Sequence, residues 1–260
     1  MEKQFYDEDM ARQQEKLSAT SDMVTQRRFM LNQLRLKEGE RVLDVGSGNG
    51  ILAREMLEVV GESGHVCGVD SAEPMVSMAI ALCPNGQFLQ GDATALPVED
   101  SSFDVVTASQ LLCFVPDVDK MLSEMFRALK AGGRLVILET DWGSLVWNCN
   151  DRSLMERVLQ LMTGVYADAH IPRTLSRRLM AAGFQITDRR SISVLNWDAN
   201  EDTYAQQIKG FLGPMMEASE DFTKDDWEAW SEDQRATDEA GEFLFSVNRY
   251  IFSAAKPNSL

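Results

Sequence analysis

The stretch RVLDVGSGNG (41–50) decides the fold of this chain. Residues 41–46 form a short apolar run, which is typical of a strand buried in a parallel sheet. Residues 51–60 have the pattern of a helix that ends before Gly61. The glycines between the two segments permit a tight turn and allow a ligand to approach the backbone, and the following helix begins with free N–H groups. By itself, such a turn is also compatible with a purely structural role.

The same alternation of strands and helices continues along the chain. Strands connected by short helical segments predict a parallel sheet with right-handed crossovers. Two further strands near the C-terminus, separated by an acidic helical segment, suit an antiparallel pair at one edge. The remaining predicted strands are 65–70, 86–92, 103–110, 134–140, 185–195 and 241–257, and helices are predicted at 20–36, 73–82, 118–130, 153–166, 174–182 and within 201–240.

Two acidic residues follow the glycine-rich turn at the ends of the next two strands. Asp70 ends the second predicted strand, and Asp92 ends the third, directly after Gly91. The carboxyl ends of parallel strands meet at one edge of a sheet, where open α/β folds bind ligands. An acid at the position of Asp70 accepts hydrogen bonds from ribose hydroxyls, and Asp92 is placed to accept one from an adenine amino group. The combination predicts a nucleoside site.

The glycine spacing narrows the choice of nucleoside. The dinucleotide fingerprint GxGxxG would need its third glycine at position 51, which is Ile51 here. No tyrosine is followed by lysine in the Tyr-x-x-x-Lys spacing of short-chain dehydrogenases, and no GxxxxGK[ST] loop is present. A nicotinamide oxidoreductase is therefore disfavoured and a nucleoside triphosphate site is excluded.

Five blocks of sequence resemble the class I S-adenosylmethionine (SAM)-dependent methyltransferases, in the ubiquinone/menaquinone-biosynthesis-like (methyltransferase type 11) group. They are VLDVGSGNG (42–50), GVDSAEPM (68–75), GDATALPVEDSSFDVV (91–106), FVPDVDKMLSEMFRALKAGGRL (114–135) and the last strand. The resemblance implies a doubly wound α/β fold, with a mostly parallel sheet of seven strands in the order 3-2-1-4-5-7-6 and an antiparallel last strand.

The resemblance also assigns the cofactor-binding residues. The glycines of the turn pack against the methionine part of SAM, Asp70 holds the ribose, and Asp92 and Ala93 flank the adenine. Ser109 and Gln110, after the fourth strand, lie near the sulfonium. The expected cofactor contacts are Asp44, Gly46, Ser47, Gly48, Gly50, Asp70, Ser71, Met75, Gly91, Asp92, Ala93, Ser109 and Gln110.

The acceptor side is predicted from the loops after the fourth and fifth strands. Asp141 is expected to orient the acceptor or take its proton, with a helix cap as the alternative, and His170 is a second candidate base, with a surface histidine as the alternative. Trp142 is read as a pocket wall or a core residue, and Arg173 as an anion clamp or part of a solvated helix face. Phe114 stands where many relatives carry a histidine, and is expected to contact the substrate.

Composition limits the classes of partner. The chain has 260 residues and a formal net charge of −16, which argues against nucleic acid or an anionic membrane as the main partner. No secretion signal or membrane span is visible, the four cysteines have no CxxC spacing, and only two histidines are present. We expect a cytoplasmic protein without a metal site, either a monomer or a homodimer.

The organisation predicted is one methyltransferase domain over 1–260. Residues 1–36 form an N-terminal helical lid, 37–195 the SAM-binding core, 196–240 a helical substrate cap and 241–257 the final strand. The predicted activity is methyl transfer to O, N, S or C of a small molecule, by in-line displacement. A quinone-ring C-methyltransferase and a SAM-binding module without catalysis remain as alternatives.

Overall fold

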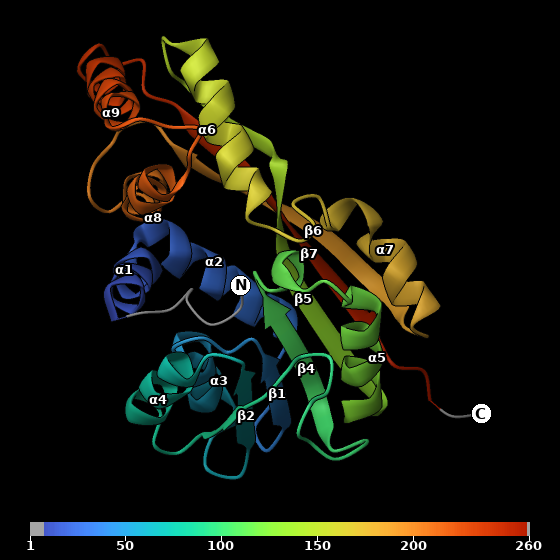
Figure 1. Cartoon of the computed structure of the whole chain (residues 1–260). Helices are drawn as coiled ribbons and strands as arrows, with labels where there is room; N and C mark the ends of the chain where they lie inside the picture. Colours follow the sequence, from blue (N-terminus) through green and yellow to red (C-terminus); the bar gives the residue numbers. More distant parts are fainter. Residues whose placement is uncertain (1–7, 259–260) are drawn as a thin grey trace.

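A single seven-stranded sheet forms the centre of the computed structural model, which describes residues 8–258 (Figure 1). The strand order is β3-β2-β1-β4-β5-β7-β6, which confirms the predicted order. The first five strands are parallel, and β7 is antiparallel to both of its neighbours. The strands are β1 Arg41–Val45, β2 His65–Asp70, β3 Gln87–Gln90, β4 Phe103–Ser109, β5 Leu129–Trp147, β6 Gln185–Asn196 and β7 Phe245–Ala255.

Helices cover both faces of this sheet, because its central strands carry apolar side chains on both sides. On one face, α2 (Ser21–Leu34), α3 (Ile51–Val60) and α4 (Glu73–Leu82) share a buried cluster with alternate strand residues such as Val42 and Leu138. On the other face, α5 (Val118–Ala128) and α7 (Pro172–Ala181) pack against the intervening residues such as Leu43 and Ile137 (Figure 1).

A second layer of helices packs beyond the end of β4. It comprises α6 (Arg152–Gly164), α8 (Tyr204–Ala218) and α9 (Lys224–Glu239), with α1 (Glu8–Ala19) against α8. Figure 1 shows β5, β6 and β7 continuing upward to reach these helices. Trp147 on β5 meets Trp230 of α9 and Phe245 of β7 edge to face, with centroids 5.1 and 4.9 Å apart. These aromatic contacts dock α9 onto the sheet extension.

Several predicted boundaries are wrong. Helix α1 precedes the helix predicted at 20–36, which begins at Ser21 with Thr20 as its N-cap, because the Thr20 side chain accepts a hydrogen bond from the Met23 amide. Strand β5 begins at Leu129, where the helix predicted to extend to 130 has already ended, and it continues to Trp147 instead of stopping at 140. Pairing with β7 continues past Asp141, with a register shift before Val146. The first seven residues of the predicted lid lie outside the described part.

A matched pair of glycine substitutions tests how closely the turn after β1 packs. Gly50 has φ +81°, and a Cβ there would lie 2.9 Å from Ala79 Cβ and 3.0 Å from Ala79 Cα of α4. Gly48 has φ +53° with nothing within 4 Å. We expect Gly50→Ala to lower the free energy of unfolding by roughly 2–4 kcal/mol and Gly48→Ala by only about 1 kcal/mol, since the latter meets backbone strain alone. Urea unfolding measures both, and equal losses would contradict the packing argument.

Candidate cofactor and acceptor site

The turn after β1 is tied to the end of β2. The amides of Gly46 and Ser47 both donate to the carbonyl of Val69, at 2.7 and 3.1 Å. The Asp70 carboxylate then accepts hydrogen bonds from the Gly48 amide at 2.8 Å and the Ala72 amide at 2.9 Å. The glycine turn and Asp70, the residue predicted to bind the ribose, therefore form one hydrogen-bonded unit at the carboxyl edge of the sheet.

Two buried polar atoms in this unit have no partner among the described residues. They are Oδ2 of Asp44 and Oγ of Ser47, and Asp44 is 2% exposed. Burial and the nearby charge of Asp70 raise the pKa of Asp44 to about 7. A buried acceptor without a donor is unfavourable unless a ligand supplies one. SAM carries an ammonium group and ribose hydroxyls, so Asp44, Ser47 and Asp70 are chemically suited to hold it.

The remaining predicted cofactor residues extend from this unit to neighbouring strands. The Gly91 amide donates to the Asp70 carbonyl at 2.9 Å, which places Asp92 and Ala93 beside the ribose acid. Asp92 is exposed, and its carboxylate accepts from the amide and hydroxyl of Thr94 at 2.7 and 2.9 Å. Ser71 is exposed just after β2, whereas Met75 is buried in α4.

On the other side of the turn, Gln110 is held in an unusual backbone conformation. Its φ is +56°, and its Oε1 accepts a hydrogen bond from the Thr140 hydroxyl at 2.7 Å, while its buried Nε2 has no partner. Non-glycine residues rarely adopt such a φ, and they concentrate at functional sites. Ser109 precedes it as the last residue of β4. The position of both residues at the reacting end of the cofactor stays a prediction.

Glu139 holds the segment that follows Gln110 in place through hydrogen bonds to its backbone. Its Oε1 accepts from the amides of Leu111 and Leu112, at 2.7 and 2.6 Å, and burial raises the pKa of Glu139 to about 7 despite these bonds. The Leu111 side chain in turn lies over Gly46, where a Cβ would come within 2.7 Å of it. Sequence reasoning assigned no role to Glu139 or Thr140, although polar residues ending the apolar run RLVILET (134–140) were a usable signal.

Three predicted acceptor-side residues come together at Asp141. Its carboxylate accepts from Arg173 Nε at 2.8 Å and Nη2 at 3.1 Å, and lies 3.1 Å from His170 Nδ1. Burial acts to raise the pKa of Asp141, but the hydrogen bonds from Arg173 and His170 and the Arg173 charge lower it overall. Asp141 lies within β5 and caps no helix. The alternation of side chains along the strand directs it to the face opposite Thr140.

The aromatic residues predicted for the acceptor side are joined by Tyr166, which sequence reasoning missed. Tyr166 stacks on Trp142 with ring centroids 5.0 Å apart and an interplanar angle of 16°, and its centroid is also 5.0 Å from that of Phe114. Trp142 is buried with an unpartnered Nε1, whereas Phe114 is exposed. No periodic pattern singles out Tyr166, because it lies in the turn after α6.

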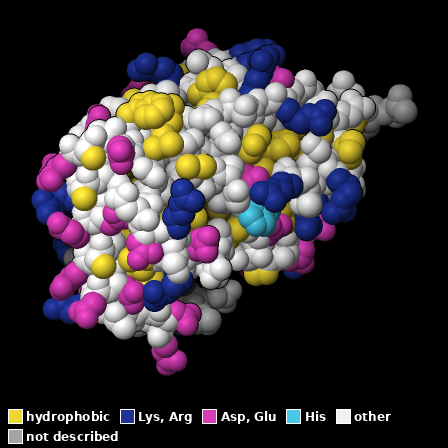
Figure 2. Space-filling model, turned by 90° about the horizontal axis from the view of Figure 1, so that it is seen from above, with side chains coloured by type: hydrophobic (Ala, Val, Ile, Leu, Met, Phe, Trp, Pro, Cys, Tyr) yellow, Lys and Arg dark blue, Asp and Glu magenta, His cyan; other side chains and the backbone are white. Residues whose placement is uncertain are grey.

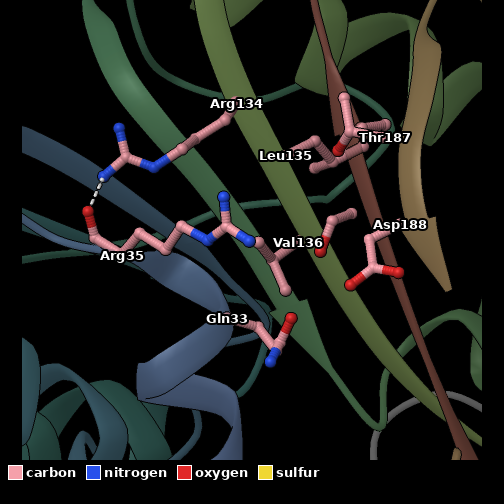
Figure 3. Close-up of a pocket in the computed structure, with 9 residues that line it drawn as sticks. Gln33, Arg35, Arg134, Leu135, Val136, Thr187 and Asp188 are labelled. Carbon is pink, nitrogen blue, oxygen red and sulfur yellow. Dashed lines mark hydrogen bonds between the residues drawn. The ribbon is translucent and has the colours of Figure 1, made fainter. Parts of the chain in front are cut away.

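Two cavities lie away from this site. A space of about 90 Å³ lies where the end of α2 meets the start of β5 and β6, at the amino edge of the parallel strands. In Figure 3 the guanidinium of Arg134 turns to the carbonyl of Arg35, to which it donates at 2.9 Å, and Asp188 lies across the cavity. A wider hollow of about 790 Å³ is lined by residues of α1, α8 and the segment before α8. Neither cavity is lined by the residues of the glycine turn, so neither is the cofactor site.

The surface also bears on possible ligands. Seen from above, the molecule presents Asp and Glu side chains mostly over the left half of the face, while Lys, Arg and hydrophobic side chains occur over both halves (Figure 2). In the described part, no helix is long and apolar enough to cross a membrane. Within the same residues, no group of three or more His, Cys, Asp or Glu is arranged to hold a metal ion.

Comparison with known proteins agrees with the motifs. A family described as a methyltransferase domain matches residues 43–137. The chain is 32% identical over 200 residues to an uncharacterised 37.1 kDa protein of transposon TN4556 from Streptomyces fradiae, covering 75% of this chain and 57% of that one. It is 39% identical over 119 residues to the ubiquinone/menaquinone biosynthesis C-methyltransferase UbiE of Vibrio vulnificus, covering 44% and 46%. The chain thus spans about half the length of these curated relatives.

The fold is shared with solved methyltransferases. Phosphoethanolamine N-methyltransferase 2 of Haemonchus contortus, solved with SAM, superposes with a TM-score of 0.64 over 98% of this chain and 59% of that one, at 20% identity. At this identity the likeness concerns the fold alone. Residues 43–137 thus match a methyltransferase domain, and the motifs and the strand order agree with the class I SAM-dependent methyltransferase fold.

Proposed function

We propose that this protein transfers a methyl group from SAM to a small-molecule acceptor. The observation that carries the proposal is the unit formed by the glycine turn, Asp70 and the unpartnered Asp44 carboxylate at the carboxyl ends of β1 and β2. SAM supplies an activated methyl group, and the acceptor displaces the sulfur in line. The protein's task is then to orient the two molecules and exclude water. The small-molecule nature of the acceptor and a cytoplasmic location belong to the same proposal.

Two alternatives use the same cofactor site. A quinone-like ring as C-acceptor is favoured by the likeness to UbiE, whose name states this chemistry. A SAM-binding module without catalysis would need only the cofactor residues. The strained Gln110 and the aromatic group around Tyr166 favour an enzyme, because a binding module has no need of an organised acceptor side. Incubation with methyl-labelled SAM and a panel of acceptors distinguishes an enzyme, which transfers the label, from a binding module, which does not.

The first test is cofactor selectivity. We expect calorimetry to show binding of SAM and S-adenosylhomocysteine but not of NAD(P). The turn and Asp70 suit a single nucleoside, whereas the glycine spacing differs from that of dinucleotide-binding turns. Asp70→Ala should weaken SAM binding by about 1.5–3 kcal/mol, through the loss of hydrogen bonds to a charged acceptor. Asp100→Ala, an exposed acid in the loop before β4, is the matched control. Binding of NAD without a response to SAM would refute the proposal.

The pH dependence of SAM affinity tests the role of Asp44. Its pKa of about 7 in the free protein means that the carboxyl is largely protonated at pH 6. A bound cation favours the carboxylate, so binding releases a proton, and affinity should rise with pH by up to about tenfold per unit before levelling off above pH 7. Asp44→Asn should bind more weakly at pH 8 and show a flat profile. A wild-type profile that falls with pH would exclude this linkage.

Asp141 and His170 are proposed as the catalytic pair, on the face of β5 opposite Thr140, from which His170 would reach the acceptor past the end of β4 at Ser109. With Asp141 bound to Arg173, His170 is the group free to take a proton, and Asp141 orients its ring. We expect Asp141→Asn and His170→Asn each to lower turnover by roughly 10–100-fold while SAM affinity stays nearly constant. Unchanged turnover in both variants would take the pair out of the chemistry.

The predicted lid is retained as a proposal for residues 8–36 and 196–240. Contacts between α1 and α8, including the bond from Gln13 Nε2 to the Gln207 carbonyl at 2.6 Å, join the two segments. We expect hydrogen exchange in both to slow when S-adenosylhomocysteine binds, because covering segments open at low free energy. Strand β1 serves as the internal control. Equal exchange with and without ligand would count against a lid.

A further inference from the structure

Arg249 is the one Lys or Arg side chain in the described part that is buried. It is 1% exposed, on β7, with Thr140 of β5 as its register partner. Its Nη1 donates to Gln26 Oε1 and contacts Met23 Sδ of α2, and its guanidinium carbon lies 4.5 Å from the ring centre of Tyr204 on α8. All three neighbours are neutral, and Nε has no partner.

No carboxylate within the described residues forms an ion pair with this guanidinium. Asp22 is the acid on the adjoining part of α2, and its Oδ2 accepts instead from Asn196 Nδ2 and the Tyr204 amide, both at 2.8 Å. Burial of a charge without a counter-charge is strongly unfavourable, and surrounding dipoles offset only part of the penalty. An apolar residue at position 249 would avoid this penalty. Because no contact within the described protein offsets the penalty, the buried arginine indicates an anionic ligand.

The position of Arg249 agrees with such a ligand. Thr140, opposite Arg249 on the same face of the sheet, donates to Gln110, whose Nε2 is unpartnered. Trp142, two residues along β5 on the same face, has an unpartnered Nε1. Unsatisfied donors from β4, β5 and β7 thus gather next to the expected position of the sulfonium, where an acceptor molecule must lie. The unpartnered atoms of Gln110, Trp142 and Arg249 are all donors, which suits an anion. The unpartnered acceptors Asp44 Oδ2 and Glu139 Oε2 belong to β1 and to the opposite face of β5.

We propose that Arg249 binds a carboxylate of the methyl acceptor, so that the substrate of this enzyme is a monoanionic carboxylic acid. This rests on the proposed function. In the protein without SAM, one guanidinium among neutral groups balances one negative charge, and a dianionic phosphate would leave a net negative charge in a buried site. The chain's net charge of −16 also repels a dianion more than a monoanion. A planar carboxylate matches the fork of the guanidinium.

Access to Arg249 requires α2 and α8 to separate, because Gln26 and Tyr204 cover it. These helices belong to the two proposed lid segments. The acceptor would enter between them, and closure would return Gln26 and Tyr204 to the guanidinium with the carboxylate in place.

Calorimetry with defined probes tests the proposal on the full chain, with and without S-adenosylhomocysteine. The probes are acetate, benzoate and octanoate, each with its neutral amide, and inorganic phosphate. We expect at least one carboxylate to bind and its amide to bind at least about tenfold more weakly. Arg249→Gln should weaken the carboxylate by about 10–100-fold, with S-adenosylhomocysteine affinity unchanged. Arg249→Lys should bind at an intermediate level, and Arg190→Gln, an exposed arginine on β6, should match the wild type.

The outcomes separate this proposal from the proposed function. If the wild type does not bind S-adenosylhomocysteine, the proposed methyltransferase activity is refuted. Binding of the carboxylate probes is measured separately, on the protein without cofactor. Absence of carboxylate binding, a preference for phosphate, or binding that survives Arg249→Gln overturns the Arg249 proposal. Arg249→Met covers the case in which the Gln variant fails to fold. A ligand-free melting temperature at or above that of the wild type supports a ligand role, and a fall of several degrees shows a structural one.

Discussion

The continued pairing of β5 with β7 is the constraint on which the acceptor side depends. β5 is 19 residues long, whereas β1 has 5, and its ladder with β7 extends from Arg134 to Trp147. The hydrogen bonds of this ladder carry the sheet beyond the ends of β1 and β4. Helices α6, α8 and α9 need an apolar surface to pack against, and the extension provides it through Trp147 and Phe245. Without this extension, these helices would have no apolar sheet surface against which to pack.

The site therefore combines two environments. The cofactor side lies at the carboxyl edge of the parallel sheet, where the Val69 carbonyl and the Asp70 carboxylate hold the turn rigidly. The proposed acceptor side draws on segments far apart in the chain, namely α2, the end of β5, the turn after α6, α8 and β7. Most buried polar atoms without a partner lie along this boundary, including those of Asp44, Gln110, Trp142 and Arg249. Their desolvation lowers stability, and a bound ligand compensates for it.

Local signals predicted the cofactor half closely. The bounds of α3, β2 and α4 follow directly from the periodicity of their apolar residues and from Gly61 and Pro74. Short elements between tight turns have few alternative positions at which to begin or end. The end of β5 was missed, and the bounds of α1 within the predicted helical lid were not given, for a physical reason. A strand continues as long as a neighbour accepts its hydrogen bonds, and that neighbour, β7, is about one hundred residues away in sequence. Helix α1 is polar and depends on its contacts with α8.

What the sequence alone determined is the doubly wound fold, the glycine turn and the acids at the ends of adjacent strands, because these depend on backbone freedom and on patterns a few residues long. Only the tertiary structure decided which side chains meet. Asp141 lies with Arg173 and His170 on one face of β5, while Thr140 lies with Gln110 and Arg249 on the other. One residue of register separates these two environments, and long-range pairing sets that register. The arginine of SVNRYIF (246–252) reads as an ordinary strand residue until the fold buries it without a counter-charge.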